Sequence, residues 1–455
     1  MDISEKVKLQ REYFKSGKTL NVSFRLNALN MLEKAIKNHE KEVLAALKTD
    51  LGKSAQEAFM CEYGLSLSEL TYMKKHLKKF ARPKRVKTPL TNFAAASYIC
   101  KVPYGNVLIM SPWNYPFLLT MEPLIDAIAA GNTAFVKPSA YSPATSEAIR
   151  VIIEEAFEPE FVSVILGGRA ENQQLLDEKF DFIFFTGSQT VGKEVMKRAS
   201  ANLTPVALEL GGKSPCIIDA DADIKLSAKR LVFGKYLNVG QTCVAPDYVL
   251  CHKDIKDEFL NAVKEEILKQ FPNALTNPDY GKIINEKHFD RIVSLIDNSK
   301  VAFGGNFDKA TLKIEPTVLD NVTFDDAVMK EEIFGPIMPI LSFENLDDVL
   351  KDIDSRQHPL AFYYFTKDTK KAKRVISSCR FGGGCINDTI IHLATSEMPF
   401  GGVGESGMGN YHGKFGFNAF SHTKSIVDKK RFIDVNMRYQ PYNSNKLNLI
   451  SGFLK

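Results

Sequence analysis

Hydrophobic and polar residues follow two different periodicities along this chain, and the first predicts a helical opening. After Ser23 the apolar positions recur at helical spacing until Gly52, so we expect one or two amphipathic helices that begin at Ser23 and stop at this glycine. The apolar positions in this stretch are Leu26, Leu29, Leu32, Ile36, Val43, Leu44 and Leu47.

From residue 106 the pattern changes to short apolar runs that are separated by stretches of helix length. Buried parallel strands with crossover helices have this pattern, because helices cover both faces of each strand. A second alternation of the same kind begins after Gly212, which predicts two α/β domains. The runs occupy residues 107–110, 133–136, 162–165, 182–185, 216–218, 248–251 and 338–341.

The run 182–185 leads directly into Thr186, Gly187 and Ser188, and a helical pattern begins near Thr190. Backbone N–H groups at the amino terminus of a helix have no intrahelical partner, so they can face a phosphate. Gly187 and Gly192 do not match the common G-x-G-x-x-G fingerprint. This glycine pattern alone does not identify a cofactor.

Composition is that of an ordinary globular protein. The 455 residues exceed what one core usually supports, and 44% hydrophobic and 25% charged residues are typical values. The net charge of +5 is small, and the basic runs near residues 74–87 and 370–374 are interrupted by apolar residues. We interpret these runs as solvated helix faces rather than nucleic-acid patches.

Neither a leader sequence nor an apolar run of the ~20 residues that a membrane span needs is apparent, so we expect a cytoplasmic protein. The seven cysteines are an odd number without paired short spacings, which predicts reduced thiols and no zinc site. The tail carries apolar residues at helical spacing, and we expect it to pack against the protein rather than a membrane surface. These tail residues are Leu447, Ile450, Phe453 and Leu454.

Candidate chemistry is concentrated in unusual polar motifs. They are PWNYP (112–116), ELGGKSP (209–215), QTCVAP (241–246) and EEIFGP (331–336). A thiolate that attacks a carbonyl needs a donor for the oxyanion it creates, and the adduct must later be released by an activated water. Cys243 provides the thiol, Asn114 a side-chain donor and Glu209 a base.

These motifs, with FTGSQTVG (185–192) and PFGGVGESGMG (399–409) in the same order, resemble the aldehyde dehydrogenase superfamily. The short lead before the Trp-Asn motif is similar to the class 3 branch, which includes fatty and aromatic aldehyde dehydrogenases. The resemblance implies an α/β fold with a variant Rossmann cofactor domain, an α/β catalytic domain and a small oligomerisation extension. We assign residues 1–84 and 102–210 to the cofactor domain, 211–400 to the catalytic domain, and 85–101 and 401–455 to bridging segments used in a homodimer.

The resemblance also implies a role for each motif. A core cysteine, a turn asparagine and a strand-end glutamate are ordinarily structural. By resemblance Cys243 is instead the nucleophile, Asn114 and the Cys243 backbone N–H stabilise the oxyanion, and Glu209 activates water. Nearby backbone N–H groups, rather than a histidine, would favour the thiolate.

The same resemblance implies NAD or NADP as the cofactor. Glu332 would bind the nicotinamide ribose and Phe334 would support the ring, while Lys137 would contact the adenosine ribose. Gly187 and Ser188 form the turn that faces the phosphates.

One position departs from the family pattern. Many NAD-using members carry glutamate three residues after this lysine, where Ala140 stands here. Without that carboxylate, we predict that NADP is accepted as well as NAD or better. The alternative is that Ala140 lies outside the ribose site and a neighbouring loop decides.

The predicted activity is NAD(P)-dependent oxidation of an aldehyde to a carboxylic acid through a thioester. Acyl transfer to coenzyme A is an alternative, although a transferase gains nothing from a water-activating Glu209. A non-catalytic role on the same fold is a second alternative, and the complete set of site residues argues against it. A cysteine hydrolase without cofactor is disfavoured, because no histidine stands in a partner motif.

Overall fold

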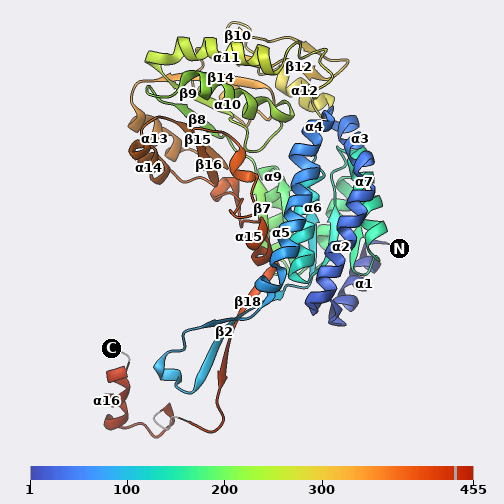
Figure 1. Cartoon of the computed structure of the whole chain (residues 1–455), viewed down its shortest axis with the longest axis vertical. Coiled ribbons are helices and arrows are strands. Elements are labelled where there is room, and N and C mark those ends of the chain that lie inside the picture. Colours follow the sequence, from blue (N-terminus) through green and yellow to red (C-terminus); the bar gives the residue numbers. More distant parts are fainter. Residues whose placement is uncertain (1, 435–437, 454–455) are drawn as a thin grey trace.

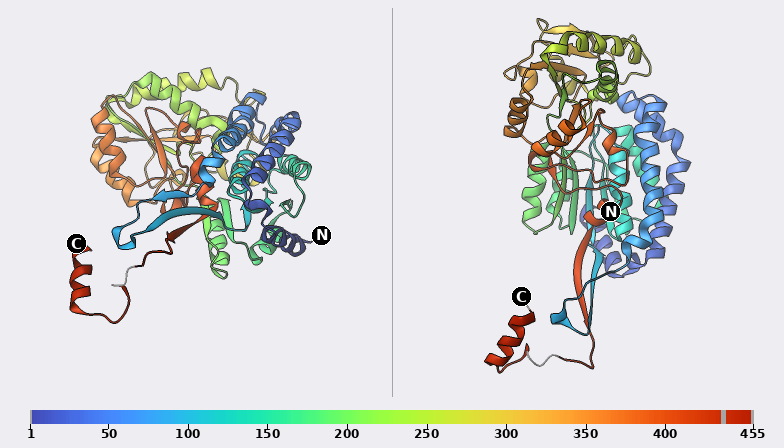
Figure 2. Two further views of the ribbon diagram at one scale, coloured as in Figure 1. Left: turned by 60° about the horizontal axis from the view of Figure 1, so that its bottom comes forward. Right: turned by 60° about the vertical axis from the view of Figure 1, so that its left-hand side comes forward.

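The computed structural model describes residues 2–434 and 438–453 of the chain, which form two α/β lobes and a protruding arm (Figure 1). The first lobe contains most of the chain up to about residue 210. The second lobe contains most of the chain from there to residue 400, and the arm extends away from both (Figure 2).

The sheet of the first lobe has six strands in the order β17-β7-β6-β3-β4-β5, and only β17 is antiparallel to its neighbour. The order reverses between β3 and β6, and ligands of open α/β sheets bind beyond the carboxyl ends of the strands at such a switch point. The strands are β3 (Asn106–Met110), β4 (Thr133–Lys137), β5 (Val162–Val164), β6 (Phe182–Gly187), β7 (Val206–Leu210) and β17 (Gly407–Met408).

Alternate residues of these strands enter two different cores, which confirms that both faces are covered. Val107 and Ile109 pack under one set of helices, whereas Leu108 and Met110 pack under the other. The first face carries α6 (Leu118–Ala130) and α7 (Pro143–Ala156), with α2 (Val22–Asn38), α3 (Glu40–Leu51), α4 (Ala55–Ala58) and α5 (Gly64–Ala81) outside them. The second face carries α1 (Ile3–Lys15), α8 (Arg169–Asp177) and α9 (Gln189–Ser200).

The helices predicted between Ser23 and Gly52 are present as α2 and α3, but the first of them begins earlier than predicted. Asn21, not Ser23, caps α2: its side chain accepts from the N–H groups of Ser23 and Phe24, so Ser23 lies inside the helix. The predicted stop is confirmed, because Gly52 ends α3 with a left-handed φ of 70°.

The second lobe contains a seven-stranded sheet in the order β10-β13-β14-β9-β8-β15-β16, in which only β10 is antiparallel to its neighbour. Its strands are β8 (Pro215–Ile218), β9 (Tyr248–His252), β10 (Val301–Phe303), β13 (Thr317–Leu319), β14 (Ile337–Phe343), β15 (Ala361–Phe365) and β16 (Gly383–Ile386). One face packs on α10 (Ile224–Tyr236) and α11 (Lys256–Gln270), and the other packs on α13 (Leu346–Ser355) and α14 (Thr369–Ser378). The short elements α12 (Glu286–Val293), β11 (Phe307–Asp308) and β12 (Lys313–Ile314) complete this lobe.

The arm is a three-stranded antiparallel sheet of β1 (Lys84–Val86), β2 (Ala95–Pro103) and β18 (Ser421–Lys429). The predicted strand extension from the segments near residues 93–101 and after 420 is therefore confirmed. The segment after residue 400 is shared, since β17 joins the first sheet and α15 (Gly413–Ala419) packs on α5 and α6.

The tail helix α16 (Ser444–Phe453) lies beyond the arm, away from both lobes (Figure 1). Leu447 is 66% exposed, so the prediction that this tail packs against its own chain is wrong; Leu454 lies outside the described residues. Among the described residues, no helix has both the length and the apolar composition that crossing a bilayer requires.

Candidate active site

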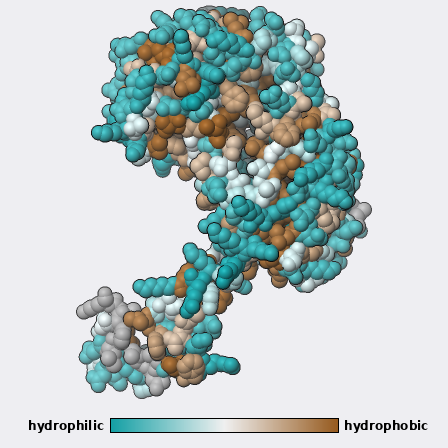
Figure 3. Space-filling view, viewed as in Figure 1, coloured by the Kyte–Doolittle hydropathy of each residue, from teal (hydrophilic) through white to brown (hydrophobic). Residues whose placement is uncertain are grey.

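A pocket of about 850 Å³ lies between the two lobes and brings together most of the predicted site residues. Figure 3 shows apolar and weakly polar side chains gathered where the lobes meet. Of the predicted residues, only Lys137 does not line this pocket. The predicted residues that line it are Asn114, Gly187, Ser188, Glu209, Cys243, Glu332 and Phe334.

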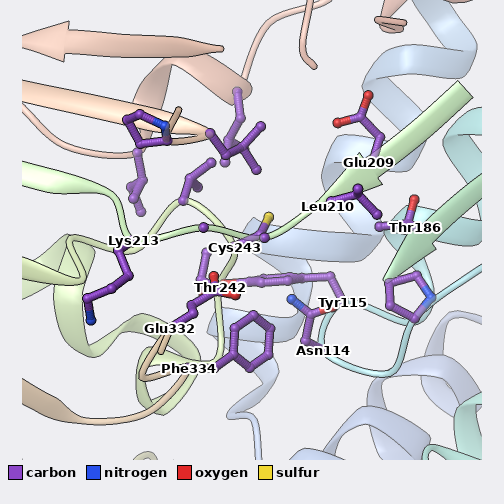
Figure 4. Close-up of a pocket in the computed structure, with 18 of the residues that line it drawn as sticks. Asn114, Tyr115, Thr186, Glu209, Leu210, Lys213, Thr242, Cys243, Glu332 and Phe334 are labelled. Atoms are coloured by element: carbon purple, nitrogen blue, oxygen red, sulfur yellow. The ribbon is translucent and has the colours of Figure 1, made fainter. Parts of the chain in front are cut away.

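Cys243 lies in the loop between the 3₁₀ turn Leu237–Gly240 and β9, with its sulfur facing the pocket (Figure 4). Burial raises the pKa of the Cys243 thiol to about 12, and the carboxylates of Glu332 and Glu209 add to the increase. The backbone N–H groups of Cys243 and Val244 lower this pKa, as predicted, but burial has the larger effect. The resting side chain is therefore a neutral thiol.

Asn114 follows β3 at the switch point and is 3% exposed. Its side-chain amide donates to the carbonyl of Gln241 at 3.0 Å, two residues before the nucleophile. Gln241 is itself held by donation to the carbonyl of Lys282 and by acceptance from the N–H of Ile284. Since an amide has two N–H groups, this contact leaves the second one for an oxyanion at Cys243.

Glu209 stands near the end of β7, on the opposite wall of the pocket from Asn114 (Figure 4). It is 3% exposed, and neither carboxylate oxygen has a hydrogen-bond partner among the residues that the structure describes. Burial raises the pKa of Glu209 well above its ordinary value. An unpaired carboxyl group with a raised pKa in a pocket is typical of a general base.

Glu332 and Phe334 come from the loop before β14 (Figure 4). Burial raises the pKa of Glu332 to about 8, with Asp247 adding to the effect. The carboxylate lies so close to Gly211 that a side chain there would collide with it. Phe334 has a left-handed φ of 49° and packs edge-on against Trp113, with ring centroids 5.3 Å apart.

The residues at the start of α9 fit a dinucleotide phosphate. Ser188 caps this twelve-residue helix by accepting from the N–H of Val191, and Gly187 to Thr190 line the pocket at its amino terminus. Lys137 ends β4, which β3 separates from β6 in the sheet, and its ammonium donates to the Pro138 carbonyl at 2.8 Å. Burial lowers the pKa of Lys137 to about 8.

Two buried polar contacts in the pocket were not predicted. The hydroxyl of Tyr115 lies 2.6 Å from Oγ1 of Thr242, so two motifs that were recognised separately are joined directly. His412 and Glu122 form an ion pair at 3.2 Å. No motif in the sequence indicated a role for either residue. Among the described residues, no cluster of histidine, cysteine or acidic side chains is arranged to hold a metal ion.

The remainder of the pocket wall is predominantly apolar. Met60 and Ile391 are exposed at its mouth, and the buried Leu118 lies further inside. Other apolar lining residues are Leu65, Leu119, Phe233 and Leu237. This wall suits an uncharged, apolar ligand next to the thiol.

Comparisons with known proteins agree with this geometry. A family model described as the aldehyde dehydrogenase family matches residues 1–426. The chain is 47% identical to 4,4'-diaponeurosporen-aldehyde dehydrogenase of Staphylococcus aureus, over 100% of this chain and 99% of that protein. It is 43% identical to a dog protein named aldehyde dehydrogenase, dimeric NADP-preferring, over 96% and 98% of the two chains. A structure titled the substrate-bound state of S. aureus AldH superimposes over 100% of both chains, with a TM-score of 0.98 and 46% identity.

Proposed function

The chain belongs to the aldehyde dehydrogenase family and is an NAD(P)-dependent oxidoreductase, and we propose that it oxidises apolar aldehydes through a thioester on Cys243. One observation carries this proposal: Cys243, Asn114, Glu209 and Glu332 line a single pocket between the two lobes. The apolar wall beside them supports an apolar substrate.

In the proposed mechanism, each residue acts on a defined atom. The Cys243 thiol releases its proton to solvent, the resulting thiolate sulfur attacks the aldehyde carbon, and the free N–H of Asn114 donates to the oxyanion that forms. Bound NAD(P) supplies the hydride acceptor for the next step. Glu209 then takes a proton from the water that hydrolyses the thioester, which releases the acid and restores the thiol.

Hydrolysis rather than transfer to coenzyme A is supported by the unpaired carboxylate of Glu209 in the pocket. We expect the product of an aliphatic or aromatic aldehyde to be the free acid, with a rate of cofactor reduction that coenzyme A does not change. Product analysis with and without coenzyme A tests this. Formation of an acyl-coenzyme A product would contradict it.

The cofactor preference is proposed to depend on position 140. Ala140 is exposed, three residues after Lys137. A carboxylate here would repel a 2′-phosphate by roughly 1 to 4 kcal/mol at about 4 Å. We therefore expect Ala140→Glu to lower kcat/KM for NADP by about tenfold or more relative to NAD, because 1.4 kcal/mol corresponds to a factor of ten.

Ala140→Gln is the matched control, since it adds nearly the same volume without charge. Its NADP to NAD ratio should stay near that of the unmodified enzyme, which we expect to accept NADP at least as well as NAD. Discrimination against NADP by about a hundredfold in the unmodified enzyme, or equal ratios in the two variants, would show this reading of position 140 to be wrong.

We propose that the arm mediates a homodimer. On β18 the successive residues Ile426 and Val427 are 42% and 53% exposed, so both faces of the arm sheet present apolar side chains. Light scattering should give about twice the chain mass of 50.9 kDa. The double variant Ile426→Asp/Val427→Asp should give the single-chain mass, whereas Leu203→Asp, at a 90% exposed position outside the arm, should stay dimeric. A monomeric unmodified protein at micromolar concentration would contradict the proposal.

A further inference from the structure

A buried ion pair between Lys53 and Glu62 lies directly behind the loop that carries Asn114. Both side chains are fully buried, and the Lys53 ammonium is 2.5 Å from Oε1 of Glu62. The charges belong to neither the nucleophile nor the base, and burying them is costly unless every polar atom is satisfied. The other hydrogen-bond partners of Lys53 and Glu62 therefore show which part of the chain the pair holds in place.

The Lys53 ammonium makes three contacts, which is the number of its N–H groups. The first is the carboxylate of Glu62, and the second is the backbone carbonyl of Asn114 at 3.1 Å. The third is the face of the Tyr115 ring, whose centroid is 4.0 Å from Nζ. Two of the three contacts thus fix consecutive residues of the loop that carries the oxyanion donor.

The Glu62 carboxylate fixes the other end of the same loop. Its Oε2 accepts from the N–H of Phe117 at 2.8 Å and of Leu118 at 3.3 Å, which are unpaired groups at the start of α6. Glu62 lies in the π-helical turn Phe59–Tyr63 before α5, and such turns are frequent at functional sites. The pair therefore spans the loop from Asn114 to Leu118.

The Asn114 carbonyl also links this loop to the loop of the nucleophile. Besides Lys53, it accepts from the side-chain amide of Asn238 at 2.8 Å, and that amide donates to the Gln241 carbonyl as well. The backbone N–H of Asn238 in turn donates to Glu57 at 2.8 Å. A shift of the Asn114 backbone would therefore move the donor relative to Cys243.

We propose that Lys53 and Glu62 are positioning residues that hold the Asn114 loop and thereby aim the Asn114 amide at the oxyanion on Cys243. The inference rests on the oxyanion role proposed above for Asn114. Neither charged group touches the reacting atoms. Their effect is transmitted through the backbone of the loop.

A double-mutant cycle between Lys53→Met and Asn114→Ala tests this, with the rate of the first turnover of cofactor reduction as the readout. We expect Lys53→Met to slow this step by about 10- to 100-fold, because a misplacement of 1 Å can cost about 10²-fold. Asn114→Ala should slow it by about 10²- to 10³-fold. In the Asn114→Ala background, Lys53→Met should add less than about threefold, because it acts through a donor that is already absent.

Burst amplitude and cofactor binding report whether the variants are intact, and both should match the unmodified enzyme. Lys256→Met is the matched control, since it removes a partly buried ammonium that is 2.5 Å from Asp320 and outside the pocket. It should lower the melting temperature without slowing the first turnover. If Lys53→Met does not fold, Glu62→Gln enters the same cycle, because its amide keeps the volume and an acceptor for the Phe117 N–H.

The outcomes separate this inference from the function on which it rests. If Asn114→Ala leaves the first turnover unchanged, the proposed role of Asn114 fails. If Asn114→Ala is slow but the Lys53 or Glu62 variant reacts at the normal rate, the positioning role fails. Effects that simply multiply in the double variant would also overturn it, since they would show that the pair acts independently of Asn114.

Discussion

Replacing Cys243 with serine is expected to reduce aldehyde oxidation to below about one thousandth of the original kcat/KM. The loss corresponds to about 4 kcal/mol of transition-state stabilisation. A serine hydroxyl forms no anion near neutral pH, whereas even a thiol whose pKa burial raises to about 12 gives a small fraction of a strong nucleophile. Retention of more than about a tenth of the rate would rule out Cys243 as the nucleophile.

Cofactor binding separates a chemical loss from a structural one. The Cys243→Ser variant should bind NAD(P) normally, since the helix start at Ser188 and the loop of Glu332 are unchanged. Replacing Cys216 with serine is a suitable control, because this cysteine is fully buried in β8 and does not line the pocket. Cys216→Ser should cost stability while the folded enzyme keeps its rate.

The sequence predicted the strands, and it predicted candidate site residues that meet in one pocket, because both depend on local signals. The apolar run 133–136 corresponds to β4 (Thr133–Lys137), since a strand buried on both faces needs a continuous apolar run. Cys243, Asn114 and Glu209 stand in motifs whose composition is unusual for a core or a turn. The fold brings these motifs to one pocket at the strand ends, as the resemblance implied.

The sequence could not predict features that depend on contacts between distant residues. Lys53 and Glu62 belong to none of the motifs recognised in the sequence, and only the fold places Lys53 against the carbonyl of Asn114, 61 residues away. The pKa of the Cys243 thiol is a second example. The sequence predicted that nearby backbone N–H groups favour the thiolate, but the burial that raises the pKa more strongly depends on how the two lobes meet. The start of α2 was predicted wrongly because Asn21 and Ser23 are both good N-capping residues.

Glu209→Gln is expected to separate the two halves of the reaction. The variant should still produce a burst of about one reduced cofactor per active site, because acylation of Cys243 does not need this base. Steady turnover should fall by about 10²- to 10⁴-fold, the usual contribution of a general base. Stopped-flow absorbance measures both quantities in one experiment, and an equal loss of burst and turnover would place Glu209 in an earlier step or in a structural role.

The pH dependence of turnover gives an independent check of the same assignment. Glu209 accepts a proton only when ionised, and burial raises its pKa well above its ordinary value. Where hydrolysis limits the rate, turnover of the unmodified enzyme should therefore fall on acidification at a pH well above about 4.3, the value for an exposed glutamate. The slow turnover of Glu209→Gln should lack this decline, because the amide does not titrate. If the decline persists unchanged in the variant, another group is the base, and Glu332, whose pKa burial raises to about 8, is the next candidate in the pocket.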